Sequence, residues 1–312
     1  MAQIVAIGEI LVEIMATRIG QTFLEPGLFA GPYPSGAPAI FADQAARVGA
    51  TTALISCVGP DDFGTLNLNR LAASGVATSG VRRVPGTTTG SAFVTYRADG
   101  GRDFIYNIAN SAAAELDAAQ LTPELFAGCR YFHVMGSSLF SARIAAAVRR
   151  GVELAKAAGA RISFDPNIRK ELLSLPDVAA TIAAVLEVTD VLLPSDADLE
   201  HLCPGQGEAE AAQSLLAAGR QMVLLKKGAR GSVYHDADRR IAAAAFPTEE
   251  VDPTGAGDCF GGTFVASLAL GLPLERALRL ANAAGALAVS RKRPMEGNST
   301  MAELEAFLAD KP

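Results

Sequence analysis

Short apolar runs alternate with longer amphipathic stretches along most of the chain, a pattern typical of buried strands joined by helices. The predicted strands lie at residues 4–14, 51–59, 131–136, 161–167, 190–195 and 222–228. The clearest predicted helices lie at residues 37–49, 61–76 and 141–159, each of which ends close to a glycine. Buried strands with helical crossovers predict an α/β fold, in which helices flank a doubly wound, mostly parallel sheet.

Two segments do not follow this alternation. Residues 15–34 are irregular and rich in glycine and proline, whereas residues 87–108 alternate around a DGG turn, which predicts an antiparallel hairpin. Neither segment joins a parallel sheet easily. We therefore expect a single domain over residues 1–312, with a small β lid formed by segments at about 15–34 and 86–110.

The composition excludes several classes of protein. The 312 residues carry a formal net charge of −6, so there is no basic surface for nucleic acid and no polybasic membrane patch. No apolar run approaches the roughly 18 residues of a membrane span, and Glu9 and Glu13 interrupt the apolar N-terminus before a secretory segment could form. The 4 cysteines are far apart and form no C-x-x-C pair. These features are typical of a cytoplasmic protein.

The stretch VDPTGAGDCFGGTFVASLALG, residues 251–271, places glycines and one aspartate at the start of an apolar helix. Thr254 is expected near the N-cap of that helix. The amides of Gly255, Ala256 and Gly257 would then point out of the helix, where they and the helix dipole attract an anion. The segment therefore predicts a binding site for a phosphate or a similar group.

Asp258 follows these amides directly and has two interpretations. It could complement the helix dipole as an acidic residue of the first turn. It could instead be a base, because a carboxylate beside an anion site repels the ligand unless it accepts a proton. Further along the helix, Gly261 and Gly262 each cost about 1 kcal/mol relative to alanine, which close packing against a neighbouring helix would explain.

Common nucleotide-binding motifs do not account for this segment. GAGDCFG nearly matches G-x-G-x-x-G, but its third glycine is one residue late and the motif lies near the C-terminus. The Walker pattern G-x-x-x-x-G-K-[ST] does not occur. A dinucleotide-dependent oxidoreductase would need a glycine-rich turn after the first strand, where only Gly8 is present. A catalytically silent sugar or nucleotide sensor is a further alternative.

The segment DPTGAGDCFGGTF resembles the C-terminal signature of the ribokinase-like (PfkB) carbohydrate kinases, D-T-x-G-A-G-D followed by a glycine-containing helix. Other family landmarks follow in order along nearly the whole chain: GEILVE, SGAPAIFADQAARVGATTALISCVGPDDFG, FDPNIRK, LPSDADLE and VLLKKGARG. The resemblance implies a ribokinase-like fold and the phosphorylation of a sugar hydroxyl by ATP with Mg²⁺. Asp258 would accept the hydroxyl proton, and the amides of residues 255–257 would stabilise the transferring phosphoryl group.

The resemblance also assigns residues to the nucleotide. Lys226, Gly228 and Gly231 resemble the turn that lines the nucleotide. Asn282 matches a position near the adenine, although helix packing explains it equally well. Ser195 begins the segment that replaces the family's N-x-x-E magnesium motif, so it is also expected at the ATP site.

Two ion sites are implied in the same way. Asp198 keeps a carboxylate at the last position of the altered N-x-x-E motif, and it would hold Mg²⁺ through water. Asp252 and Thr254 resemble part of a monovalent-cation site, for which K⁺ is the candidate.

The sugar substrate would meet residues from several segments. The residues that the resemblance assigns to it are Glu13, Gly36, Ala37, Tyr106, Arg169 and Asp258. Ile40 stands where the family's N-terminal signature usually has an asparagine, which puts one sugar contact in doubt.

The chain is most similar to 2-keto-3-deoxygluconate kinases and to tagatose-type ketose kinases. The keto-acid enzymes carry Y-Y-R-x-x-S-A on the lid, whereas this chain has YNIANSA, with Ile108 in place of the arginine. The loss of a bidentate donor favours a neutral ketohexose such as tagatose or fructose. A keto acid stays the alternative, because Arg169 or a lid residue could bind its carboxylate. An exposed strand edge on the lid also predicts a possible homodimer.

Overall fold

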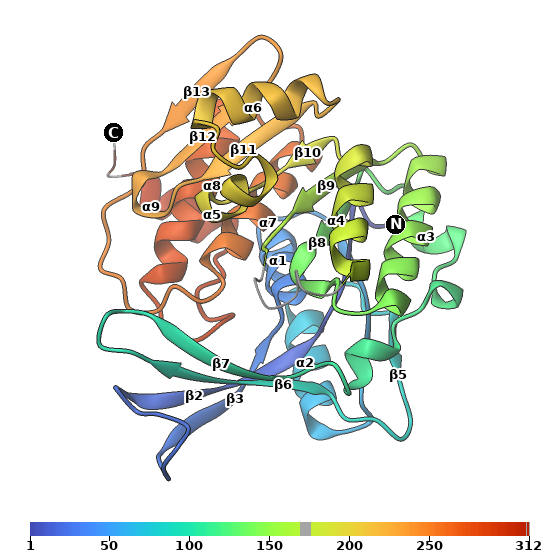
Figure 1. Cartoon of the computed structure of the whole chain (residues 1–312), viewed down its shortest axis with the longest axis vertical. Coiled ribbons are helices and arrows are strands. Elements are labelled where there is room, and N and C mark those ends of the chain that lie inside the picture. Colours follow the sequence, from blue (N-terminus) through green and yellow to red (C-terminus); the bar gives the residue numbers. More distant parts are fainter. Residues whose placement is uncertain (169–175, 310, 312) are drawn as a thin grey trace.

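Residues 1–168, 176–309 and 311 are described by the computed structural model, and they form a larger and a smaller β-sheet (Figure 1). The larger sheet has the strand order β13-β12-β11-β10-β9-β8-β1-β4-β5. Its strand bounds are β1 (Ile4–Ile7), β4 (Thr52–Val58), β5 (Val81–Arg83), β8 (Tyr131–Met135), β9 (Arg161–Asp165), β10 (Val191–Leu192), β11 (Met222–Lys226), β12 (Ser232–His235) and β13 (Arg240–Ala243).

The strands from β5 to β11 are parallel, and β12 and β13 extend the sheet as antiparallel neighbours. This order confirms the predicted doubly wound, mostly parallel sheet. The antiparallel extension was not indicated by the apolar pattern, because β13 is short and half-exposed.

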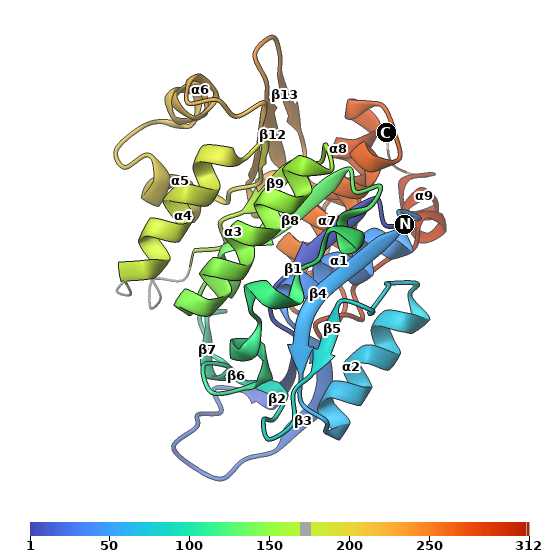
Figure 2. The same ribbon diagram turned by 90° about the vertical axis from the view of Figure 1, so that its right-hand side faces the viewer.

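Helices cover both faces of the larger sheet because successive strand residues point to opposite sides. On β1, Ile4 and Ala6 belong to one buried cluster, and Val5 and Ile7 belong to the other. Helices α1, α2, α7, α8 and α9 pack on the first cluster, and α3, α4, α5 and α6 pack on the second (Figure 2). The helix bounds are α1 (Ala37–Arg47), α2 (Asp62–Ala73), α3 (Ala142–Ala157), α4 (Pro176–Val188), α5 (Asp196–Leu202), α6 (Glu208–Ala217), α7 (Ala256–Ala269), α8 (Leu274–Val289) and α9 (Met301–Ala309).

The smaller sheet has the strand order β3-β2-β6-β7. Its strands are β2 (Leu11–Ile19), β3 (Phe29–Ser35), β6 (Gly90–Tyr96) and β7 (Arg102–Asn107). Strands β6 and β7 form the predicted antiparallel hairpin, and β6 also pairs in parallel with β2. The sheet includes most of the segments at 15–34 and 86–110, but it begins earlier, at Leu11.

The predicted strand at 4–14 is therefore wrong as one element. The chain leaves the larger sheet after β1 and enters the smaller sheet at β2. Gly8 lies at the division with a φ of 147°, and a Cβ there would clash with the side chain of Ser138. A residue with a side chain would be strained in this conformation. An uninterrupted apolar pattern carries no sign of this bend.

The remaining global expectations concern cysteines and membrane spans. Within the described residues, every cysteine is buried and free of disulfide bonds. Across the same part of the chain, none of the helices combines the length and the apolar character that crossing a bilayer requires.

Candidate functional site

A cleft of about 1090 Å³ lies beside the carboxyl ends of the parallel strands, and the smaller sheet contributes to its lining. In an open α/β sheet, this edge is where ligands bind. The cleft brings together most of the residues that the sequence singled out: Glu13, Gly36, Ala37, Tyr106, Ser195, Asp198, Lys226, Gly228, Gly231, Thr254, Gly255, Ala256, Gly257, Asp258 and Asn282. Asp252 is buried outside the lining. Arg169 lies outside the described residues.

Helix α7 begins one residue later than the sequence suggested. Its N-cap is Gly255, with a left-handed φ of 79°, and not Thr254. A Cβ at Gly255 would lie 2.8 Å from the backbone oxygen of Pro294 and 3.3 Å from the Ile40 side chain. Backbone conformation and space thus both require glycine, whereas the N-cap prediction considered only the preference for a hydroxyl side chain.

The first turn of α7 offers fewer open amides than expected. The amide of Ala256 already donates to the backbone oxygen of Pro253 at 3.3 Å. Among the described residues, the amides of Gly255 and Gly257 have no backbone acceptor. A Cβ at Gly257 would lie 3.6 Å from Nζ of Lys226, so the ammonium group lies close to this helix end. Two amides and a lysine therefore make this region attractive to an anion.

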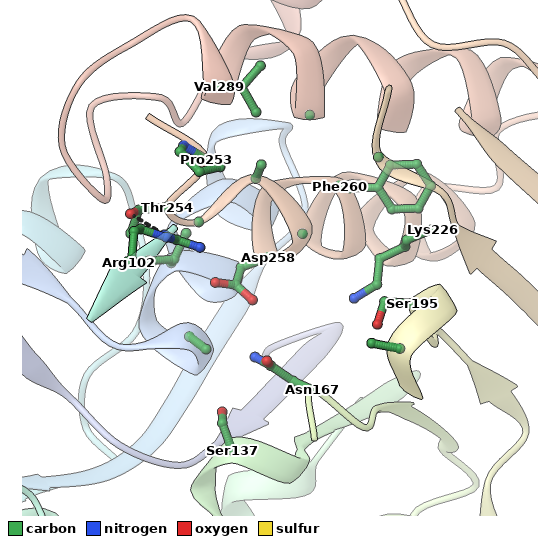
Figure 3. Close-up of a pocket in the computed structure, with 18 of the residues that line it drawn as sticks. Arg102, Ser137, Asn167, Ser195, Lys226, Pro253, Thr254, Asp258, Phe260 and Val289 are labelled. Carbon is green, nitrogen blue, oxygen red and sulfur yellow. Dashed lines mark hydrogen bonds between the residues drawn. The ribbon is translucent and has the colours of Figure 1, made fainter. Parts of the chain in front are cut away.

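Asp258 is the third residue of α7 and lines the cleft. Figure 3 shows its carboxylate directed into the same space as the side chains of Lys226 and Asn167. The negative charge of Asp258 is also one of the causes that raise the pKa of Lys226. The base interpretation requires an aspartate that faces a cleft beside an anion site, and Asp258 has that position.

Asp165 pairs with Lys226 at the ends of β9 and β11. Burial raises the pKa of Asp165 to about 6, although the charge of Lys226 opposes this shift. Burial lowers the pKa of Lys226, but the negative charges of Asp165 and Asp198 outweigh it, so the net pKa is raised. Asp165 was noted in the sequence only as part of a strand end, and its pairing with Lys226 depends on the alignment of β9 and β11 through β10.

Asp198 has a structural role that the sequence comparison did not indicate. Ser195 is the N-cap of α5, and its amide and hydroxyl both donate to Oδ2 of Asp198, at 2.8 and 2.6 Å. The amide of Ile168 donates to the other carboxylate oxygen at 2.7 Å. This capping box holds the end of β9 next to α5. Each oxygen keeps a lone pair, so an ion bound through water is still compatible with it.

The donor chemistry near Asp198 fits magnesium. Asp165 and Asp198 provide the carboxylate oxygens that Mg²⁺ prefers, and Oδ1 of Asp165 has no hydrogen-bond partner among the described residues. No group of three or more His, Cys, Asp or Glu side chains within that part of the chain could hold a metal ion alone. A magnesium ion here would therefore take most of its ligands from water and from phosphate oxygens.

The proposed monovalent-cation residues are occupied by protein donors. Oδ1 of Asp252 accepts from the amide of Thr254 at 3.0 Å. Oδ2 accepts from Tyr96 Oη at 3.3 Å and from the amide of Arg293 at 3.2 Å. The hydroxyl of Thr254 accepts from Arg102 at 2.7 Å. These side-chain oxygens fix the turn before α7, and a K⁺ site there stays a prediction that they do not support.

The sugar-side residues come from β2, α1 and β7. Glu13 is 7% exposed and accepts a hydrogen bond from the hydroxyl of Ser35 at 2.6 Å. Tyr106 stacks on Phe104 with ring centroids 5.2 Å apart, and both rings line the cleft. Gly36 and Ala37 lie at the start of α1. Carboxylate, ring and backbone groups thus surround one end of the cleft.

Asn282 combines the two alternatives that the sequence left open. Its Nδ2 donates to Ser232 Oγ at 2.9 Å and to the backbone oxygen of Leu278 at 3.0 Å, which fixes α8 against β12. It also lines the cleft close to Gly231. A packing role is therefore present, and contact with a nucleotide stays a prediction.

Arg102 is a lining residue that sequence reasoning missed. The register of β7 gives the signal, because Arg102, Phe104 and Tyr106 are two residues apart and share one face of the strand. Tyr106 was assigned to the sugar, so the same face should have been followed back to Arg102.

The chain is similar to carbohydrate kinases over nearly its whole length. The pfkB family carbohydrate kinase description matches residues 1–301. A probable fructokinase-3 of Arabidopsis thaliana is 32% identical over 98% of this chain and 91% of its own. A putative ribokinase II from E. coli, solved in an apo form and with ATP and Mg²⁺, is 49% identical with TM-scores of 0.96 and 0.95, covering 99% of both chains. A fructokinase from Vibrio cholerae O395, with fructose, ADP and calcium ion bound, is 26% identical with a TM-score of 0.86, again covering 99% of each chain.

Proposed function

This chain belongs to the pfkB family of carbohydrate kinases, and from that premise we propose that it phosphorylates a ketohexose of the fructose or tagatose type with Asp258 as the base. The reaction class, phosphoryl transfer from ATP to a sugar, follows from the family and its relatives. It excludes the oxidoreductase and silent-sensor alternatives. The observation that carries the residue assignment is Asp258 in the first turn of α7, facing the cleft.

The proposed reaction uses the chain's own groups as follows. The sugar hydroxyl oxygen forms a bond to the γ-phosphorus, and its proton passes to the carboxylate of Asp258. The bond from the γ-phosphorus to the bridging oxygen breaks, and ADP keeps the electron pair. The amides of Gly255 and Gly257 and the ammonium of Lys226 would stabilise negative charge on the phosphoryl oxygens. An ordinary carboxylate suffices, because the hydroxyl becomes acidic only as transfer proceeds.

ATP would occupy the half of the cleft lined by Ser195, Gly228 and Gly231, with its phosphates towards Lys226. Magnesium bound to those phosphates would neutralise part of their charge. Asp165 and Asp198 are the residues whose donor chemistry fits that ion, partly through water.

Two observations support a neutral ketose as acceptor. The curated relatives are named fructokinases, and an aliphatic side chain, Ile108, lines the cleft where a keto-acid kinase would have an arginine. The 2-keto-3-deoxygluconate alternative keeps one observation in its favour, which is the cationic side chain of Arg102 in the same lining. An ADP-release assay with fructose, tagatose, aldoses, nucleosides and 2-keto-3-deoxygluconate would identify the acceptor. Turnover of the keto acid alone would reject the ketose proposal.

Substitution of Asp258 tests the base assignment. Asp258→Asn should lower kcat by about 100- to 10,000-fold, because the amide cannot accept the hydroxyl proton. ATP and sugar should still bind, as calorimetry would show, because the amide keeps the size of the side chain. Asp62→Asn is the matched control, since Asp62 is also an acid in the first turn of a helix but is exposed on α2. If Asp258→Asn retains the turnover of the Asp62→Asn control, the assignment is wrong.

A further inference from the structure

Three cationic side chains line the described part of the cleft, and two of them are already neutralised. Lys226 is paired with Asp165, and Lys227 is paired with Glu208. Arg102 differs, because it forms no ion pair with any carboxylate in the described part of the chain. A guanidinium group near the reacting atoms without a carboxylate partner is available for an anionic ligand.

Arg102 is held in a defined position by two neutral groups. Its Nη1 donates to the hydroxyl of Thr254 at 2.7 Å, and its Cζ lies 5.5 Å from the ring centroid of Phe104. Only one of the five N–H donors of the guanidinium is used by the printed contact with Thr254. The remaining donors stay available on a side chain whose rotamer is already restrained.

The location of Arg102 relative to the reaction is specific. Thr254 precedes Gly255, the N-cap of α7, so the guanidinium lies next to the turn that carries the open amides. In Figure 3, Arg102 and Lys226 lie on either side of Asp258. Lys226 is on the nucleotide side, whereas Arg102 comes from β7 of the smaller sheet, on the sugar side.

We propose that Arg102 is a catalytic residue that binds the phosphoryl group as it reaches the sugar. This inference rests on the proposed kinase reaction and deepens it. When the bond from phosphorus to the sugar oxygen forms and the bond to ADP breaks, negative charge moves away from Lys226 and towards Asp258. Arg102 then donates hydrogen bonds to the phosphoryl oxygens on the acceptor side. This contact is made in the transition state and in the product complex, and it is weak or absent with the free sugar.

Removal of the guanidinium should therefore lower kcat more than substrate binding. Arg102→Gln should lower kcat for a neutral ketose about 100- to 1,000-fold, while the KM values for ATP and sugar change by less than about threefold. The product should be affected in binding as well. The affinity of the purified variant for the sugar phosphate, measured by calorimetry without nucleotide, should fall at least about tenfold, whereas affinity for the unphosphorylated sugar should not.

Three further variants separate this role from simpler ones. Arg97→Gln is the matched control in the same hairpin, because Arg97 is exposed and paired with Asp99 and Asp103, and it should behave as wild type. Thr254→Val removes the contact that restrains Arg102 but keeps its charge, so it should lose much less activity than Arg102→Gln. Arg102→Lys keeps the charge and loses the planar fork, so it should fall between Arg102→Gln and wild type. Thermal unfolding would confirm that each variant is folded.

Four outcomes would overturn the inference. Equal losses in Arg102→Gln and Thr254→Val would make Arg102 a support of the turn, and an unchanged affinity for the sugar phosphate would remove the phosphoryl contact. Wild-type turnover in Arg102→Lys and Arg102→Gln alike would remove any catalytic role. A loss confined to 2-keto-3-deoxygluconate, with fructose and tagatose unaffected, would assign Arg102 to a substrate carboxylate. If the wild-type enzyme phosphorylates no ketose, the proposed function fails first, and the Arg102 variants are not needed to show it.

Discussion

Asn298 links the residue after the proposed base to a buried ion pair. Its Oδ1 accepts from Cys259 Sγ at 2.9 Å, and its Nδ2 donates to Asp43 Oδ2 at 2.7 Å and to the backbone oxygen of Ile40 at 3.1 Å. Asp43 in turn pairs with Arg70 at 3.1 Å. Because Asn298 and Asp43 are both almost fully buried, the position of the first turn of α7 depends on this one amide.

Two substitutions of Asn298 should differ in their dependence on pH. Asn298→Ala leaves buried groups without partners and should cost about 1–3 kcal/mol of the free energy of unfolding. Asn298→Asp places a second carboxylate beside Asp43, so it should cost more at neutral pH. Like charges raise the pKa of the folded pair above the unfolded value of about 4. The extra cost should therefore be absent below that value and grow as pH rises through the folded pKa.

Urea unfolding from about pH 4 to about pH 8 would measure these differences. Asn110→Asp is the matched control, since Asn110 is exposed, and its free energy of unfolding should follow wild type at every pH. A constant difference between Asn298→Asp and Asn298→Ala across that range would contradict the expected repulsion.

At this scale, sequence reasoning succeeds where one short segment contains the whole signal. The TGAGD segment identifies Asp258 without any structural information, because amides and acid lie next to each other. Asn298 and Arg102 gave no such signal. Their partners are 39 and 152 residues away, at Cys259 and Thr254, so only the folded chain brings them together.

Helix α7 depends on close contact with α1, and the two adjacent glycines of α7 contribute differently. A Cβ at Gly262 would lie 2.7 Å from the backbone oxygen of Phe41, which cannot move without shifting α1. A Cβ at Gly261 would meet only side-chain atoms at 3.5 Å or more, which is ordinary van der Waals contact. The sequence predicted close packing for both glycines, and the structure confirms it only for Gly262.

These two glycines therefore provide a matched pair of substitutions. Gly262→Ala should destabilise the protein by about 1–3 kcal/mol, because it overpacks the interface of α7 and α1. Gly261→Ala should be neutral or stabilise it by up to about 1 kcal/mol, because alanine is the better helix former. Chemical unfolding of the two variants would compare them directly. Equal stability of the two would show that the interface adjusts more easily than its backbone contact suggests.

Exposed apolar side chains gather on the smaller sheet and its loop at the scale of the whole molecule. Ile19, Leu24 and Leu28 are 75%, 96% and 76% exposed, and Ile105 on β7 is 46% exposed. Ile105 is on the face of β7 opposite to Phe104 and Tyr106, so it points away from the cleft. Strands β3 and β7 are also the two edges of this sheet. Such a surface favours association with a second copy of the chain.

We expect a homodimer formed through the smaller sheet. Ile105→Glu should shift the protein towards monomer, because the new charge would be buried at the contact. Leu270→Glu is the matched control, since Leu270 is 37% exposed at the end of α7, and it should not affect the assembly. Sedimentation velocity at several concentrations would measure both variants. A wild-type monomer at all concentrations would contradict the expectation.

The global fold could be predicted in outline because buried parallel strands leave continuous apolar runs in the sequence. The separation into two sheets could not, because β1 and β2 form one such run and only the backbone at Gly8 divides them. The parallel pairing of β2 with β6 joins segments about 80 residues apart, and a local pattern contains no information on such a pairing.

The hairpin of β6 and β7 has one further consequence, for the history of the family. Strand β7 is hydrogen-bonded to β6 alone, so its residues can be exchanged without disturbing the rest of either sheet. Phe104, Tyr106 and the residues that follow them face the acceptor, whereas the nucleotide half of the cleft is built from other elements. Acceptor preference can therefore diverge among descendants by changes in a few codons of one edge strand, while the use of ATP is inherited unchanged.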